Sequence, residues 1–194
     1  MKFTKILGVV AVAALALMAF ASSASATTLE VKGVTQTGSV TIAASLKSGT
    51  SALLSDTSGF FANTCTTSTV EGSTSTKTGT VVTGGITVLS WGTVATPCKE
   101  GNPTVDAKGS LSVERIGTTT NGTVKSENAK VTVPSALGTL TCTTPEAGTD
   151  LGTLTGVASG QATMDINAVL PCGITAKWTG TYVVTSPEGL GVTG

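Results

Sequence analysis

The chain has 194 residues with 11 basic and 11 acidic side chains, so its net charge is zero. It contains no histidine, which excludes Ser-His-Asp and Cys-His catalytic triads and histidine-ligated zinc. The basic side chains form no patch in the sequence, which makes nucleic acid a poor candidate partner.

The first 26 residues have the pattern of a secretory signal peptide. Lys2 and Lys5 form a basic segment, residues 6–20 are an uncharged apolar run, and Ala24-Ser25-Ala26 is a small-x-small cleavage site. The apolar run is short for a membrane-spanning helix, and an uncleaved N-terminal anchor is the alternative. Cleavage near Ala26 would leave residues 27–194, in which no second long apolar run occurs. We therefore expect a protein that is secreted, extracellular or associated with the cell envelope, with no transmembrane segment in the mature chain.

Threonine is the most frequent residue, at 39 positions, and glycine occupies 24. Threonine and valine favour extended strands, whereas glycine disfavours helices, so the composition predicts an all-β protein. A flexible Thr/Ser-rich stalk is the alternative for Thr64–Thr83. The chain that remains after cleavage can bury about two-thirds of its unfolded surface, which is enough for one core.

Alternating apolar residues predict the strands in the first part of the domain. Leu29-Glu30-Val31 and residues 40–44 are expected to be its opening strands. Residues 52–61 are apolar without alternation, and we expect a short helical turn or a buried loop there.

The middle of the chain contains a predicted central strand and a predicted hairpin. Residues 86–91 are expected to form the central strand. Apolar residues in the segment 111–116 lead into Asn121-Gly122, the strongest two-residue hairpin signal. The strand that follows this turn is expected within residues 124–133.

The last two strands have the clearest period of two. Apolar and polar residues alternate over 158–168 and again over 174–184, and Pro171-Cys172-Gly173 between them predicts a turn. The two strands are therefore expected to pair as a hairpin. Trp178 and Tyr182 lie on the same face of the second strand. We expect them in the core, and a stacking platform for carbohydrate is the alternative.

A sparse pattern occurs twice and includes all four cysteines. Thr64-Cys65-Thr66-Thr67 recurs as Thr141-Cys142-Thr143-Thr144, and Pro97-Cys98 recurs as Pro171-Cys172. Repeating units of roughly 75 residues are longer than solenoid repeats and suit two halves of one β domain.

The predicted fold is therefore all-β, a pseudo-symmetric antiparallel β-sandwich or barrel built from two tandem β modules with two disulfides. Residues 1–26 are the signal peptide, and residues 27–194 are a single β domain. The internal duplication covers about 39–116 and 117–186.

Four cysteines allow three disulfide connectivities. An exported chain favours disulfides, and a duplicated unit that carries its own bridge favours Cys65–Cys98 and Cys142–Cys172. A zinc site built from the four cysteines is the alternative, but zinc sites use pairs of cysteines only a few residues apart, and the sequence has none.

The acidic residues are scattered, which gives little support for catalysis. Asp150 with Asp165, or Glu146 with Asp150, could form a carboxylate pair, whereas solvated surface charges are the simpler interpretation. We predict no catalytic, cofactor-binding or metal site and no enzymatic activity.

Several segments resemble those of small secreted proteins from high-GC Gram-positive bacteria. The resemblance lies in the general character of the sequence over most of the mature chain, and no single segment is a diagnostic motif. It implies secretion and a β-rich domain, but it identifies no functional residue. The segments that carry it are residues 121–126, 131–135, 138–142 and 152–170.

Three classes of function remain open. The first is a secreted or envelope-associated, non-catalytic β domain that binds an envelope or extracellular partner or has a structural role. The second is a subunit of an oligomeric β-barrel pore, because a strand that alternates like residues 158–168 could face lipid. The third is a small hydrolase that uses a carboxylate pair.

Overall fold

The computed structural model describes residues 26–56, 58–75 and 78–194, so the predicted signal peptide lies outside it except for Ala26. Strands and turns make up these ranges, and the prediction of an all-β fold is confirmed. Within the described residues no helix is long and apolar enough to cross a membrane.

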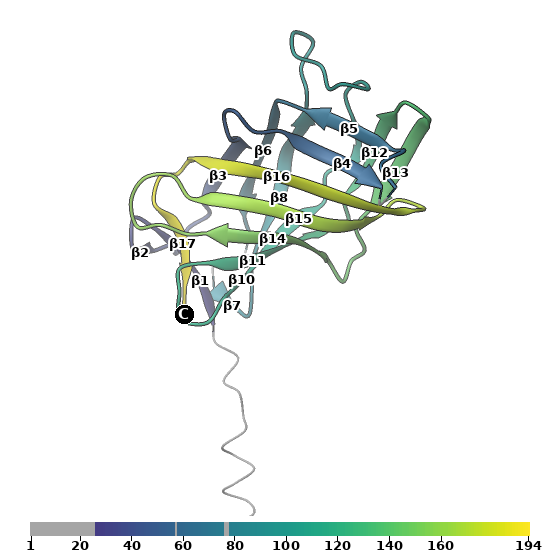
Figure 1. Cartoon of the computed structure of the whole chain (residues 1–194). Helices are drawn as coiled ribbons and strands as arrows, with labels where there is room; N and C mark the ends of the chain where they lie inside the picture. The colour runs from purple at the N-terminus through teal and green to yellow at the C-terminus, as the bar shows by residue number, and fades with distance from the viewer. Residues whose placement is uncertain (1–25, 57, 76–77) are drawn as a thin grey trace, which may run out of the picture.

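Eight antiparallel strands of the described chain close into a barrel (Figure 1). Each strand pairs with the next barrel strand along the chain, and the last pairs with the first through Tyr182 opposite Leu46. This is an up-and-down barrel, in which each of the eight strands pairs with a barrel strand on both sides over at least part of its length. The eight strands are β3 (Thr41–Leu46), β6 (Ser68–Thr74), β8 (Val82–Trp91), β10 (Ser110–Arg115), β11 (Gly122–Glu127), β14 (Thr149–Thr155), β15 (Thr163–Pro171) and β16 (Thr175–Ser186).

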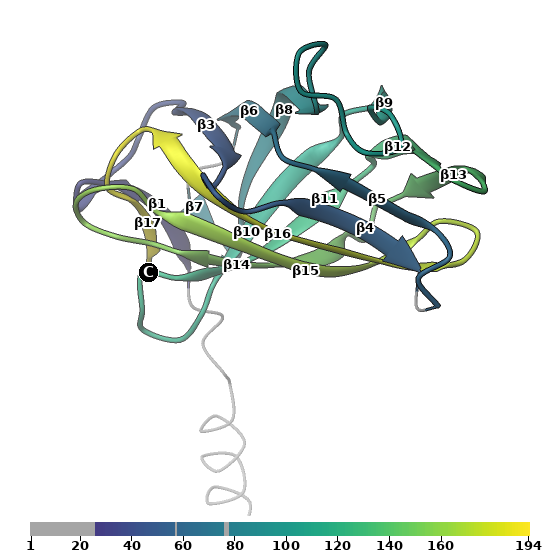
Figure 2. The same ribbon diagram turned by 45° about the horizontal axis from the view of Figure 1, so that its top comes forward.

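Two hairpins extend the barrel at one end (Figures 1 and 2). The first consists of β4 (Ala52–Asp56) and β5 (Ala62–Cys65), and β4 also pairs with the first half of β16. The second consists of β12 (Lys130–Ser135) and β13 (Gly138–Thr143), and β12 also pairs with β9 (Thr104–Ala107). We call this end of the barrel the disulfide end, because both disulfides lie there.

The opposite end is covered by the first and last strands of the described chain. β1 (Thr27–Val31) pairs with β17 (Leu190–Thr193), and it also pairs with β2 (Val34–Thr35) and β7 (Thr78–Gly79). We call this end the terminal-strand end. In Figure 1 it lies at the lower left, away from the two hairpins.

Disulfide bonds join Cys65 to Cys98 and Cys142 to Cys172, as the sequence predicts. Each bridge links the second strand of one hairpin to the segment between two barrel strands. The order of elements is therefore the same in two successive sets of four barrel strands. In both sets a hairpin lies between the first and second barrel strands, and a bridged cysteine lies between the third and fourth. The set β3, β6, β8 and β10 corresponds in this way to the set β11, β14, β15 and β16.

In the first half of the chain the structure contradicts one local prediction and one alternative. The described part of residues 52–61, which omits residue 57, contains β4 and the turn residues 58–61 before β5, so the predicted helical turn is wrong. β4 is paired on both sides, and its residues after Ala52 are all half-buried, so the period of two is lost from its sequence. The segment Thr64–Thr83 is no stalk either, because it includes β6 and the start of β8; residues 76–77 lie outside the described residues.

The hairpin between β10 and β11 is present, but its predicted two-residue turn is wrong. Arg115 pairs with Gly122, so the loop comprises residues 116–121. Gly122 belongs to β11, where a Cβ atom would lie 2.4 Å from Cγ1 of Val113. This glycine is therefore needed because β11 packs closely against the side chain of Val113, and it is not part of a turn.

The predicted hairpin near the C-terminus is confirmed. Pairing of β15 with β16 runs from Thr163 opposite Val183 to Pro171 opposite Thr175. β15 begins at Thr163, five residues later than predicted, because residues 158–160 form a bend with Gly160 at a φ of 77°. The alternation of β15 is real, and its inward residues Met164, Ile166 and Ala168 are buried.

Candidate functional site

Two cavities lie inside the barrel, one toward each end. The cavity at the disulfide end, called the near cavity, has a volume of about 90 Å³. The cavity at the terminal-strand end, called the deep cavity, has a volume of about 110 Å³. Val70, Ile86, Leu111 and Met164 line both cavities, so these four side chains form a waist between them.

The near cavity is walled by the two hairpins as well as by the barrel. Leu54 of β4 and Val131 of β12 line it from opposite modules. Cys65 and Cys142 also line it, so each disulfide fastens a part of its wall. The shape of this cavity therefore depends on where the bridges hold the two hairpins.

Three aromatic residues form one cluster beside the near cavity. The rings of Trp91 and Trp178 meet edge to face with centroids 5.7 Å apart, and Trp178 meets Tyr182 in the same way at 6.3 Å. Trp91 and Trp178 line the cavity, whereas Tyr182 is fully buried. The expectation that Trp178 and Tyr182 belong to the core is confirmed, and the exposed carbohydrate platform is wrong.

Tyr182 has a polar group that is fully enclosed by the barrel. Its hydroxyl donates a hydrogen bond of 3.0 Å to Oγ of Ser68, which in turn donates to the carbonyl oxygen of Ser90 at 2.8 Å. Burial raises the pKa of Tyr182, because the phenolate would lose its hydration. The chain of hydrogen bonds satisfies the phenol, which therefore packs as a neutral core residue.

The polar side chains that line the near cavity already have partners. Nδ2 of Asn63 donates to the carbonyl oxygen of Gly101 at 2.9 Å, and its Oδ1 accepts from the backbone N–H of Glu100 at 3.1 Å. The hydroxyls of Ser126 and Thr144 lie 3.3 Å apart and share a hydrogen bond. The other side chains of the lining are apolar, so the cavity offers a ligand hydrocarbon and aromatic surface.

The deep cavity is closed by the terminal strands. Leu29 of β1 and Leu190 and Val192 of β17 line it, and each is at most 3% exposed. Ala44 and Val124 line the barrel wall at the same level. Apolar side chains therefore line this cavity across its end, whereas the part of its lining from β6 and β8 also includes Glu71, Ser73, Thr74 and Thr83.

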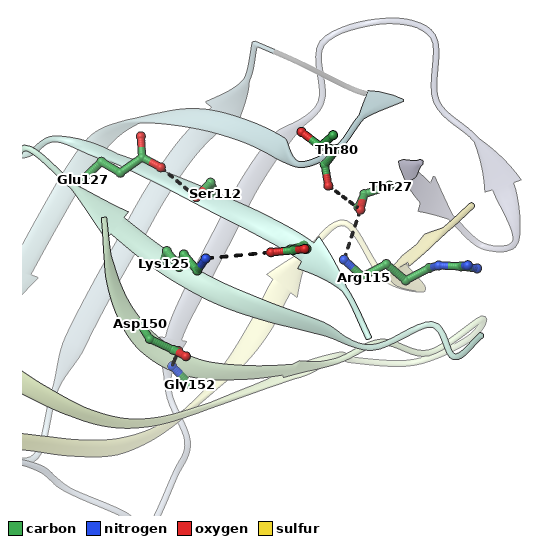
Figure 3. Close-up of polar contacts among 9 residues, drawn as sticks. Thr27, Thr80, Ser112, Arg115, Lys125, Glu127, Asp150 and Gly152 are labelled. Atoms are coloured by element: carbon green, nitrogen blue, oxygen red, sulfur yellow. Dashed lines mark hydrogen bonds and ion pairs between the residues drawn. The ribbon is translucent and has the colours of Figure 1, made fainter. Parts of the chain in front are cut away.

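The candidate carboxylates lie on the outer surface and form no pair. Figure 3 shows Asp150, whose Oδ1 accepts the N–H of Gly152 at 3.0 Å. Asp165 accepts a hydrogen bond of 2.8 Å from the hydroxyl of Thr181 and lies opposite Thr153, three residues along β14 from Asp150. Glu146 is exposed in the turn that precedes β14.

The outer surface near these residues is polar. In Figure 3 the hydroxyl of Ser112 donates to Glu127 at 2.8 Å, and Lys125 lies 3.8 Å from Glu114. These contacts connect β10 and β11 on the side away from the barrel interior. Ser112 is itself buried, at 3% exposed, and none of these residues lines either cavity.

The sequence reasoning missed the two cavities. A usable signal was the small size of several inward-facing residues, because Ala44, Ala162 and Ala168 are at most 6% exposed and fill little of the barrel. Alternation shows which face of a strand points inward, but the space left between opposite walls depends on how the strands close.

No family model matches the chain, and neither the curated proteins nor the solved structures contain a match.

Proposed function

We propose that this protein is a secreted or cell-envelope-associated, non-catalytic binding protein that takes a small apolar molecule into its barrel. The observation that carries the proposal is the pair of apolar cavities, separated only by Val70, Ile86, Leu111 and Met164. An eight-stranded barrel is just wide enough for side chains to fill it or for one small ligand to bind inside. In this barrel the inward side chains leave space that a ligand can occupy.

Export of the protein is part of the same proposal. The two disulfides indicate an oxidising environment, as is usual for extracellular proteins. The basic, apolar and small-x-small segments of residues 1–26 support cleavage by a signal peptidase after Ala26. The likeness to small secreted proteins of high-GC Gram-positive bacteria agrees with this localisation.

The direction of the side chains favours an internal binding site over a lipid-facing barrel. On β15 the apolar residues Met164 and Ile166 are buried inside, whereas Asp165 and Asn167 are exposed outside. A membrane barrel has the reverse arrangement, with apolar residues on its outer surface. The alternation that suggested a pore thus supplies the apolar lining of the cavities.

A catalytic role is not proposed. The chain has no histidine, and the three acidic residues that could have formed a pair are exposed and separate. The internal duplication, over about 39–116 and 117–186, remains a proposal. It is supported by the equivalent positions of the two hairpins and the two disulfides in successive sets of barrel strands.

Binding can be tested with 1-octanol as a probe. Trp91 and Trp178 are the two tryptophans in the sequence, and both line the near cavity. Titration of the disulfide-bonded protein should therefore change its tryptophan emission in a saturable way, with one site per chain. Ala129→Leu, which fills part of the near cavity, should weaken binding at least tenfold.

Ala147→Leu adds the same atoms at an exposed turn and is the matched control, which should bind like the unmodified protein. An emission that does not change, or that changes linearly without saturation, would overturn the proposed function.

A further inference from the structure

We infer that the ligand is an unbranched hydrocarbon chain, which enters at the disulfide end and passes Met164 to fill both cavities. This inference rests on the proposed function and specifies the chemical class of the ligand. Three features carry it: the volumes of the cavities, the side chains of the waist, and the different closure of the two barrel ends.

The volumes decide between a compact ligand and a slender one. The cavities measure about 90 and 110 Å³. A cavity of roughly 150 Å³ in another protein holds one benzene molecule, so each of these two cavities is smaller than one known to hold a ring. Pockets for drug-sized ligands are larger still, at roughly 300 Å³ or more. A chain of methylene groups is thin enough to use both small volumes in succession.

The waist contains one side chain that can move aside at low cost. Val70 and Ile86 are branched at Cβ and stiff at χ1. Met164 is unbranched, with three rotatable bonds, and methionine adapts to irregular space more readily than other apolar residues. A change in its rotamer is therefore the simplest way to connect the cavities.

The terminal strands cover one end of the deep cavity. β1 and β17 are paired across it, and Leu29, Leu190 and Val192 are buried beneath them. Pairing of β6 with β8 continues beside this cavity through Gly72 opposite Ile86, after a bulge between Glu71 and Gly72. A Cβ atom on Gly72 would lie only 2.4 Å from the carbonyl oxygen of Gly85, which shows how closely the two strands approach.

The disulfide end has the features of an entrance. Its wall consists of two hairpins that project beyond the closed barrel, as Figure 2 shows. Phe60 in the turn between β4 and β5 is 70% exposed, and Leu137 in the turn between β12 and β13 is 62% exposed. Apolar side chains thus lie on both hairpin tips, where a hydrocarbon would first meet the protein.

The lining also places the polar end of the ligand. Asn63, Ser126 and Thr144 already form hydrogen bonds within the protein and the other lining side chains are apolar, so a polar group brought into the near cavity would exchange full hydration for few partners. The polar end therefore stays in water at the disulfide end, and only the hydrocarbon tail is enclosed.

A series of straight-chain primary alcohols with 6 to 14 carbons tests the inference, with tryptophan emission or calorimetry as the measurement. Each added methylene should lower the Kd roughly fourfold while the chain is still entering the cavities. The Kd should stop falling once both cavities are full. Benzyl alcohol has the same number of carbons as 1-heptanol but contains a ring, and it should bind at least tenfold more weakly.

Cavity-filling variants locate the chain within the barrel. Ala44→Leu fills part of the deep cavity and should raise the Kd of the long alcohols while leaving the short ones unchanged. Ala129→Leu fills part of the near cavity and should raise the Kd of every alcohol. Met164→Leu should bind the series like the unmodified protein, whereas the β-branched Met164→Ile should lose the long alcohols selectively. If Ala44→Leu does not fold, comparison of Met164→Leu with Met164→Ile still tests whether the chain passes Met164.

The outcomes separate the inference from the proposed function. If no alcohol binds, both fall. If alcohols bind but benzyl alcohol equals 1-heptanol, or Kd is independent of chain length, the inference is overturned and the proposed function stands. The same conclusion follows if Ala44→Leu or Met164→Ile weakens short and long alcohols equally.

Discussion

Tyr182 combines full burial with a titratable group, and it is the single tyrosine in the sequence. Its pKa is raised above the usual value of 10.0 by burial. Below pH 10 the phenol is protonated in both the folded and the unfolded chain, and ionisation does not affect stability. Above pH 10 the unfolded chain loses the proton first, so the free energy of unfolding falls until the folded pKa is reached.

Replacement by phenylalanine isolates this effect. Tyr182→Phe loses the hydrogen bond to Ser68 and should cost about 1 kcal/mol at pH 8. Between pH 10 and 11 the unmodified protein should lose up to about 1.4 kcal/mol more than the variant. Guanidinium unfolding of both proteins at pH 8, 10 and 11 measures the difference. Parallel pH profiles for the two proteins would contradict the prediction.

Gly152 occupies a position that no other residue fits. It follows Leu151, the extra residue of a bulge in the pairing of β14 with β11. Its φ is 143°, and a Cβ atom would lie 2.0 Å from the carbonyl oxygen of Asp165. Gly152→Ala should therefore lower the free energy of unfolding by more than about 2 kcal/mol. Gly38→Ala, where a Cβ atom meets nothing within 4 Å, is the matched control and should change it by less than about 0.5 kcal/mol.

Chemical denaturation of the two glycine variants gives this comparison directly. Equal stabilities would show that β14 can shift to accommodate a side chain. In that case the bulge would be a flexible part of the wall.

At the scale of secondary structure, the disulfides offer the sharpest comparison between the two halves. The bridges span 33 and 30 residues, so chain entropy predicts nearly equal effects. Removing either bridge as a pair of alanine substitutions, Cys65→Ala with Cys98→Ala or Cys142→Ala with Cys172→Ala, should cost roughly 2–4 kcal/mol. Thermal or chemical unfolding measures both variants.

Non-reducing peptide mapping of the unmodified protein is the control for this experiment, and it should show only the two bridges of the structure. A large loss in one variant and none in the other would mean that the hairpins are not equivalent. That result would weaken the proposed duplication.

Local patterns predicted some elements well and others poorly. The β15–β16 hairpin and the two bridges were predictable, because alternation and cysteine spacing act over short distances. β4 was missed, because its residues after Ala52 are half-buried on both faces and its sequence therefore does not alternate. Pairing of Val31 with Leu190, which covers one end of the barrel, was also missed, because no local pattern records which distant strands will pair. The cavities depend on that closure, so the candidate site was not predictable either.

At the scale of the whole molecule, the predicted cleavage site adjoins the fold. Thr27 is the first residue of β1 and is fully buried. Figure 3 shows its Oγ1, which donates to Thr80 at 2.9 Å and accepts from the N–H of Arg115 at 3.1 Å. Cleavage after Ala26 would leave all of β1 in place, whereas cleavage further along would remove residues that cover the deep cavity.

N-terminal sequencing of exported protein should therefore begin at Thr27. Cytoplasmic protein that retains Met1 provides the reference. An exported chain that still starts at Met1 would contradict cleavage and favour the N-terminal anchor.

The pairing of β16 has a consequence for how the molecule opens. This strand pairs with β15 from Thr175 to Val183, and on its other side with β4 and then with β3. Its amide hydrogens in the barrel can exchange with solvent only when the closed sheet unfolds, whereas β5 and β13 each pair with one strand. Hydrogen exchange should thus be slowest in β16 and markedly faster in β5 and β13. Opening of the two hairpins while the barrel stays closed would admit a guest molecule without global unfolding.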